Sequence, residues 1–164
     1  MAPKLLHMRM IVPFLAAALA VGQPQAVLGG PPLLTVTGSI HGGDAVLGRD
    51  DLKALPQHRF ATSTTVTDGT PEFSGFLMRE LLEALGAEGE TVVAVAANDY
   101  RIEIPMADFG DFDVIGALSM DGVRLSPRDK GPIWIVYPRD DHPQLQDIRY
   151  DTRWVWQLIA LHVQ

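Results

Sequence analysis

Five consecutive apolar residues between two prolines constrain the fold of this chain more than any other feature. The run Ile133-Trp134-Ile135-Val136-Tyr137 contains no charged residue, and Pro132 and Pro138 limit it at both ends. A strand with one face in solvent alternates apolar and polar residues, whereas a strand covered on both faces does not. The run therefore predicts a short strand buried on both faces, with Trp134 in the core.

The remaining segments predict one sheet-rich domain. Leu34 to Ile40 alternates with the period of a half-buried strand, and Asp121-Gly122 is typical of a hairpin turn. Apolar residues recur at helical spacing from Phe76 to Leu85, and a short helix capped by Asp50 or Asp51 is expected to end at Leu55. A loop is expected after Pro105. Further strands are expected at residues 58–66, 92–97, 101–104, 113–120 and 155–163. The fold class expected from this order is α+β, with a few short helices.

The N-terminus has the layout of a secretory signal peptide. Lys4 and Arg9 precede thirteen residues without a charge, from Met10 to Gly22. This stretch is shorter than the ~20 residues that span a bilayer, so an uncleaved anchor is the lesser alternative. We expect a signal peptide at residues 1–22, with cleavage as late as residue 26, a flexible lead-in at 23–33, and one domain at 34–164 exported to the periplasm.

Charge and cysteine content exclude several functions. The formal net charge is −7, and a surface this acidic repels phosphate backbones, so nucleic acid is not an expected partner. The chain has no cysteine, which rules out disulfides, thiolate metal sites and thiol catalysis. The patterns G-x-S-x-G and G-x-G-x-x-G are also absent, which leaves catalysis without an obvious nucleophile or metal.

Four segments, read in order, carry a family resemblance. They are FSGFLMRELLEALG at 73–86, NDYRIEIP at 98–105, RDKGPIWIVYP at 128–138 and RWVWQL at 153–158. Together they resemble the oxidoreductase molybdopterin-binding domain, the fold of sulfite oxidase and its bacterial relatives, over residues 34–163. The resemblance implies that the first segment is a helix beside the cofactor, and that Arg153 and the adjacent tryptophan lie against the pterin.

The chain departs from the catalytic members where they carry the cysteine that binds molybdenum. The corresponding residues 60–66 read FATSTTV, and the hydroxyls of Ser63 and Thr64 are poor replacements for a soft thiolate. The resemblance then implies a subfamily of small exported proteins that bind free reduced pterins and report them to a membrane-bound diguanylate cyclase/phosphodiesterase, and so to cyclic di-GMP and biofilm formation. Similar sequences often carry tryptophan where Val66 stands.

A pterin is a flat, polar bicycle that needs aromatic partners for its faces and a carboxylate for its amino-pyrimidinone edge. Candidates for stacking include Phe73, and candidates for the carboxylate include Glu103 and Asp129. If the last strand begins before residue 154, its alternation places Trp154 and Trp156 on the same side of the sheet. The predicted pterin-binding residues are Ser63, Thr64, Asn98, Asp99, Tyr100, Arg128, Lys130, Arg153, Trp154 and Trp156.

Two alternatives stay open beside a non-catalytic pterin-binding regulator. One is a molybdopterin-dependent oxidoreductase of the sulfite oxidase type without the usual cysteine ligand. The other is an interaction domain whose pocket has decayed. Asn98-Asp99 can also be a simple turn, and Asp140-Asp141-His142 is a weak candidate for a metal cluster because neighbouring side chains in a loop rarely converge.

Overall fold

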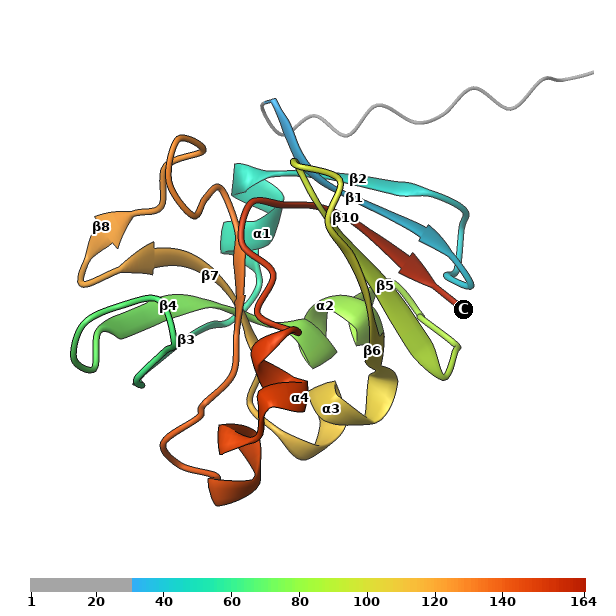
Figure 1. Ribbon diagram of the computed structural model, residues 1–164. Coiled ribbons are helices and arrows are strands. Elements are labelled where there is room, and N and C mark those ends of the chain that lie inside the picture. Colours follow the sequence, from blue (N-terminus) through green and yellow to red (C-terminus); the bar gives the residue numbers. More distant parts are fainter. Residues whose placement is uncertain (1–30) are drawn as a thin grey trace, which may run out of the picture.

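The computed structural model describes residues 31–164, which form two packed sheets with short helices between them and at the lower end of the view (Figure 1). The expected signal peptide and most of the expected lead-in lie outside the described residues. Within the described part, no helix is long and apolar enough to cross a membrane. The α+β, sheet-rich class predicted from the sequence is confirmed.

The first sheet has the strand order β2-β1-β10-β5-β6. Its central strand β10 runs parallel to β1 and antiparallel to β5, so the C-terminal strand lies inside the sheet. Strand β1 begins two residues before the predicted domain start. The bounds are β1 Pro32–Gly38, β2 Ala45–Gly48, β5 Thr91–Ala96, β6 Arg101–Pro105 and β10 Leu158–Val163.

The second sheet has the order β3-β4-β7-β8, with β9 paired to β7. Strand β9 is the middle of the continuous apolar run, and all five residues of the run are fully buried, as predicted. Trp134 packs edge-on against Phe73 of β4, with ring centroids 5.2 Å apart. The bounds are β3 Gln57–Ala61, β4 Glu72–Leu77, β7 Ile115–Met120, β8 Val123–Arg124 and β9 Trp134–Val136.

The helices are short and cover the ends of the sheets. Helix α1 begins after Gly48, and the carboxylate of Asp51 accepts a hydrogen bond from the Gly48 N–H at 2.7 Å, so neither Asp50 nor Asp51 is the N-cap residue that was predicted. The bounds are α1 Arg49–Ala54, α2 Met78–Ala84, α3 Met106–Asp111, a 3₁₀ turn η1 Pro143–Gln146, and α4 Ile148–Asp151.

The predicted helix from Phe76 was wrong at its start. Phe76 and the preceding Gly75 belong to strand β4, and the helix begins at Met78. The ladder between β4 and β7 decides this, because it continues through Phe76 to Leu77 and the apolar residues there are buried on both faces. Strand β4 and helix α2 join without a loop. The apolar residues at the end of the strand therefore continue the helical spacing, which made the helix appear to begin earlier than it does.

Three other boundaries were also wrong. The loop expected after Pro105 is helix α3, and the strand expected at 58–66 ends at Ala61. The strand expected to begin at residue 155 begins at Leu158, because Gln157 adopts a left-handed conformation with φ 50° that interrupts the extended backbone.

Candidate functional site

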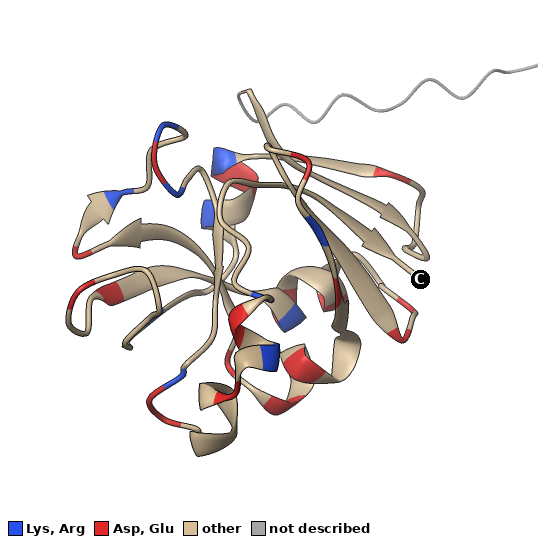
Figure 2. Cartoon of the chain, in the orientation of Figure 1, with Lys and Arg blue, Asp and Glu red and all other residues tan. Residues whose placement is uncertain are grey.

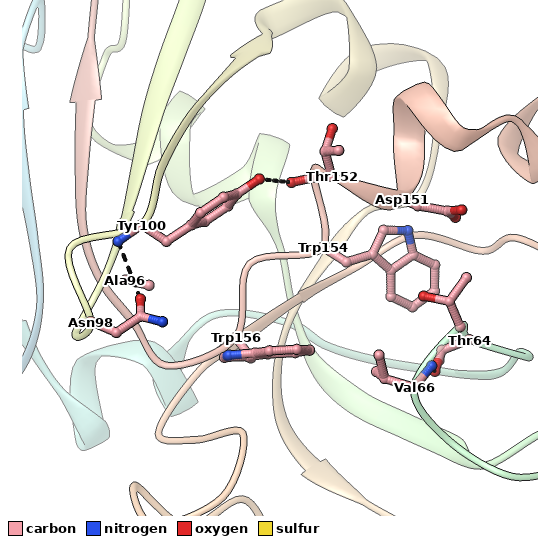
Figure 3. A pocket seen from close by; sticks show the side chains of 10 residues that line it. Thr64, Val66, Ala96, Asn98, Tyr100, Asp151, Thr152, Trp154 and Trp156 are labelled. Atoms are coloured by element: carbon pink, nitrogen blue, oxygen red, sulfur yellow. Dashed lines mark hydrogen bonds between the residues drawn. The ribbon is translucent and has the colours of Figure 1, made fainter.

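A cavity of about 260 Å³ opens where the β5–β6 hairpin, the loop after β3 and the segment after α4 meet (Figure 3). We call it the aromatic cavity. Its size is near the lower end for small-molecule pockets. The residues that line it are Thr64, Thr65, Val66, Ala96, Asn98, Tyr100, Asp151, Thr152, Trp154 and Trp156.

Two indoles form the base of the aromatic cavity. Trp154 and Trp156 each pack edge-on against the buried Trp134, with centroid distances of 6.2 and 6.3 Å. Trp156 keeps 37% of its surface exposed, so its ring has a free face. This pair matches the need of a flat heterocycle for stacking partners.

Both indoles line the aromatic cavity, although they do not lie within a strand as predicted. The segment before β10 is irregular, and Val155 between the two tryptophans is buried in the core. The left-handed Gln157 then anchors the segment, because its side-chain amide donates to the carbonyls of Pro127 and Asp129 at 3.0 and 2.9 Å. The indoles therefore have a fixed backbone.

The β5–β6 hairpin supplies the opposite wall. The Tyr100 hydroxyl donates to the carbonyl of Thr152 at 2.8 Å, which joins the hairpin to the segment after α4. The carbonyl oxygen of the Asn98 side chain accepts from the Tyr100 N–H at 3.2 Å. Asp99 has a φ of 66° and closes the turn through its N–H to Ala96, so its carboxylate does not line the cavity.

The loop after β3 forms the third wall, and Thr64 and Val66 lie on it. Ser63, at the predicted position of the missing metal ligand, turns away to the loop after β9. Its N–H and its hydroxyl both donate to the carboxylate of Asp140 at 2.6 Å, and the Asp140 N–H donates to the buried Thr62 hydroxyl. The two hydrogen bonds from Ser63 hold the pKa of Asp140 below its usual range.

A second hollow continues from the aromatic cavity past Val66. It is lined by Val66, Asp129, Lys130 and Trp156, and we call it the Lys130 cleft. The Lys130 ammonium lies 3.2 Å from the Asp129 carboxylate and 5.7 Å from the Trp134 ring centroid. An aromatic compartment thus adjoins a charged one, and Val66 and Trp156 line both.

Arg153 does not line either compartment. Its guanidinium lies 2.5 Å from the carboxylate of Asp108, which also accepts from the Tyr137 hydroxyl at 2.8 Å. Burial, followed by the charge of Asp108, raises the pKa of Tyr137. The ion pair connects the segment before Trp154 to α3, so Arg153, which was predicted to lie against the pterin, has a structural role here.

The remaining candidates lie apart from the aromatic cavity. Arg128 is exposed on the loop before the Lys130 cleft, Glu103 faces outward on β6, and Phe73 is core. Asp140 and His142 do not form a metal cluster, because the first bonds to Ser63 and the second packs against Phe112. Among residues 31–164, no group of three or more metal-ligating side chains converges.

Sequence reasoning missed five lining residues, of which Asp151 matters most. It is the carboxylate at the rim, and it ends helix α4, which the sequence did not predict. Figure 3 shows the indole nitrogen of Trp154 on the side of Asp151, and this buried nitrogen has no hydrogen-bond partner in the described part of the chain. The sequence signal that could have identified Asp151 was its position three residues before Trp154. The others are Thr65, Val66, Ala96 and Thr152.

These residues fit a pterin ring better than a molybdenum centre. Two indoles, a phenol ring and a carboxylate suit a flat heterocycle with donors on one edge, and the unpartnered Trp154 N–H can donate to a ligand atom. A molybdenum ion, by contrast, finds no thiolate in this chain, and the Ser63 hydroxyl is already bonded to Asp140.

The fold of this chain is similar to that of a protein of known structure. A solved structure of the sulfane dehydrogenase SoxCD from Paracoccus pantotrophus is similar, with a TM-score of 0.62 and 20% sequence identity. The match covers 79% of this chain and 37% of that one, so this chain spans well under half of the larger protein. At this identity the likeness shows the fold alone.

No curated protein sequence matches the chain. A family model does, and it is described as the oxidoreductase molybdopterin binding domain. It matches residues 33–140, which is more than half of the chain and includes the loop after β3, the β5–β6 hairpin and Lys130. The chain therefore belongs to the oxidoreductase molybdopterin-binding domain family.

Proposed function

We propose that this protein is a periplasmic pterin-binding regulator that binds a free reduced pterin in the aromatic cavity and has no catalytic activity of its own. The observation that carries the proposal is the combination of stacking rings and the Asp151 carboxylate at a cavity without a thiolate. Family membership supports a pterin-type ligand, and the missing cysteine favours a pterin without molybdenum.

The orientation of the ligand follows from the two compartments. The bicycle stacks on Trp156 and beside Tyr100, with its amino-pyrimidinone edge toward Asp151, whose carboxylate accepts from adjacent N–H groups. The side chain at the other end of the ring then passes Val66 into the Lys130 cleft, where the ammonium binds its polar groups.

The proposed signalling step uses two of the segments that line the aromatic cavity. The loop after β3 and the segment after α4 both line the aromatic cavity, so a ligand between them favours one arrangement of the two. We propose that this arrangement docks on the periplasmic segment of a membrane-bound diguanylate cyclase/phosphodiesterase and changes cyclic di-GMP production. The signal peptide at residues 1–22 directs the chain to that compartment.

Isolation of the protein with its native ligand tests the binding function. The full chain is expressed with its signal, purified from the periplasm, and analysed for released pterin by fluorescence and mass spectrometry, with molybdenum measured on the same sample. Stoichiometric pterin without molybdenum supports the proposal. Near-stoichiometric molybdenum with molybdopterin would favour the oxidoreductase alternative, and failure to bind added reduced pterins would leave only the fold in common with the family.

Two variants separate stacking from hydrogen bonding. Trp156→Ala should weaken pterin binding about 5- to 150-fold, because stacking of a heterocyclic base on an aromatic residue contributes about 1–3 kcal/mol. Tyr100→Phe keeps its ring and loses only the bond to Thr152, so its affinity should fall less. For the signalling step, the matching readout is cyclic di-GMP in cells that carry the wild-type or the Trp156→Ala protein in place of a deleted copy.

A further inference from the structure

A second cavity carries an unexplained cluster of positive charge. It has a volume of about 220 Å³ and lies between helix α1 and strands β4, β7 and β8. Arg49 and Lys53 of α1 and Arg124 of β8 line it, together with Ser74 and Ser119. We propose that this basic cavity binds a tetrahedral oxyanion of the phosphate or sulfate type.

The three cations are not neutralised within the described residues. Among residues 31–164, none of them has a carboxylate oxygen within 4.0 Å and none donates a side-chain hydrogen bond, whereas four of the other basic side chains pair with an aspartate. The whole chain has a net charge of −7, so acids are plentiful elsewhere. Figure 2 shows the basic positions on α1 and on β8. Like charges around one cavity repel each other unless an anion lies between them.

Among the three cations, Arg49 is the one with an unsatisfied buried donor. Its Nη2 atom is buried and has no hydrogen-bond partner in the described part of the chain. Burial, followed by repulsion from Arg124, lowers its pKa, and Asp50 opposes this only in part. A buried guanidinium nitrogen without an acceptor is destabilising, and an oxyanion oxygen would satisfy it.

The lining groups select an anion rather than a cation. No carboxylate lines the basic cavity, and the polar groups beside the three cations are the Ser74 and Ser119 hydroxyls and the Gln57 amide. The amide already donates to the carbonyls of Leu52 and Leu55, while neither hydroxyl has a hydrogen bond within the described residues. Guanidinium groups and hydroxyls are the donors that proteins use for phosphate and sulfate.

The basic cavity is separate from the aromatic cavity. Ser74 and Ser119 are register partners on one face of the β4–β7 ladder, and their neighbours Phe73 and Met120 are register partners on the other. Side chains of successive residues in a strand point to opposite faces. Phe73 packs on Trp134, beneath the two indoles, so an anion at Ser74 lies across the sheet from the proposed pterin site. This inference therefore stands independently of the proposed function.

Titration of the full chain with inorganic phosphate, sulfate and glycerol phosphate tests the proposal, with calorimetry and the thermal midpoint as readouts. We expect saturable binding and a rise in midpoint that potassium chloride of equal ionic strength does not reproduce. Arg49→Gln and Arg124→Gln should each raise the dissociation constant about tenfold, since each removes a charge-assisted bond. If glycerol phosphate binds more tightly than the free ions, the natural ligand is a phosphorylated metabolite; the reverse order identifies the free ion.

Arg101→Gln is the matched control, because Arg101 is exposed on β6, outside the basic cavity, and also has no ion-pair partner in the described part of the chain. Its phosphate affinity should be unchanged. Without anion, Arg124→Gln should be at least as stable as the wild type, since it removes repulsion from Arg49, so loss of binding would not reflect unfolding. An equal midpoint shift in chloride, or wild-type affinity in both cavity variants, would overturn the proposal.

Discussion

Val66 is the side chain at which the aromatic cavity and the Lys130 cleft meet. It lines both, and 44% of its surface is exposed. An aliphatic residue there leaves one side of a bound ring without a stacking partner. We predict that Val66→Trp raises pterin affinity several-fold, because a third indole can cover the ligand at a position with open space. Titration of intrinsic fluorescence measures the change.

The control for this prediction is Ile159→Trp. Ile159 is also β-branched and exposed, at 41%, but it lies on β10 in the first sheet and lines neither compartment. The pterin affinity of Ile159→Trp should equal that of the wild type. Unchanged or weaker binding in a normally folded Val66→Trp protein would show that the ligand does not extend past this residue.

Arg153 is predicted to stabilise the fold rather than bind the ligand. Arg153→Gln leaves the buried Asp108 carboxylate with the Tyr137 hydroxyl as its only side-chain partner in the described residues. We expect a loss of about 2 kcal/mol in the free energy of unfolding, less than the ~3–5 kcal/mol for a fully buried pair, because the arginine is 20% exposed. Urea denaturation measures this loss.

Arg149→Gln is the surface counterpart of that variant, because its ion pair with Asp147 is largely exposed. Exposed pairs contribute little, so its stability should stay near that of the wild type. The pterin affinity of Arg153→Gln should change little. A stable Arg153→Gln protein that fails to bind pterin would instead make Arg153 a ligand-binding residue.

At the scale of elements, the sequence was informative where one signal dominated. The β9 run was predicted because no polar residue interrupts it. The Asp121-Gly122 turn was predicted because Asp and Gly both tolerate the positive φ that they adopt here. The left-handed Gln157 was missed, because its side chain bonds to the distant carbonyls of Pro127 and Asp129. Helix α4 was missed because it is only four residues long, although the Asp147 side chain caps it locally. The indoles could be predicted as site residues from their residue type alone. Asp151 could not, because its place at the aromatic cavity depends on helix α4.

Gly75 determines how closely β4 and β7 approach. A Cβ at this position would overlap the carbonyl oxygen of Gly116, and a Cβ at Gly116 would overlap the Phe76 ring. We predict that Gly75→Ala costs about 1–3 kcal/mol, because the paired strands must separate. Thermal denaturation tests this cost. Gly110→Ala in α3, where a Cβ meets nothing within 4 Å, should be neutral or slightly stabilising, and equal losses in both would contradict the role of close approach.

The link between Ser63 and Asp140 joins the loop after β3 to the loop after β9. Because the pKa of Asp140 is lowered in the folded state, its stabilisation is present above the usual carboxyl range, near pH ~4, and is lost as the pH falls through the lower folded pKa. We predict that Asp140→Asn is less stable than the wild type at pH 7, and that the difference shrinks below pH ~4. Urea midpoints at both values test this.

Asp141→Asn serves as the control for that comparison, because the neighbouring carboxylate has no side-chain hydrogen bond within residues 31–164. It should show no such pH-dependent difference. A constant difference between Asp140→Asn and the wild type at all pH values would mean that the Asp140 carboxylate acts by packing rather than by charge.

At the scale of the whole molecule, the aromatic cavity is built by segments far apart in the chain. The walls come from the loop after β3, the β5–β6 hairpin and the segment between α4 and β10, so both sheets contribute. The basic cavity, in contrast, is built by α1 and the second sheet on the other side of β4. Each site should therefore stabilise a different part of the molecule.

Hydrogen exchange with saturating reduced pterin should show this division. A ligand that contacts all three walls opposes their local opening, and at about 100 times its dissociation constant it adds about 2.7 kcal/mol to the unfolding free energy. We predict slower exchange at residues 62–67, 96–100 and 151–157 together, and unchanged local exchange at residues 122–124, of which Gly122 and Arg124 line the basic cavity. Protection confined to one wall would mean that the ligand does not bridge the two sheets, and the signalling step proposed for it would lose its structural basis.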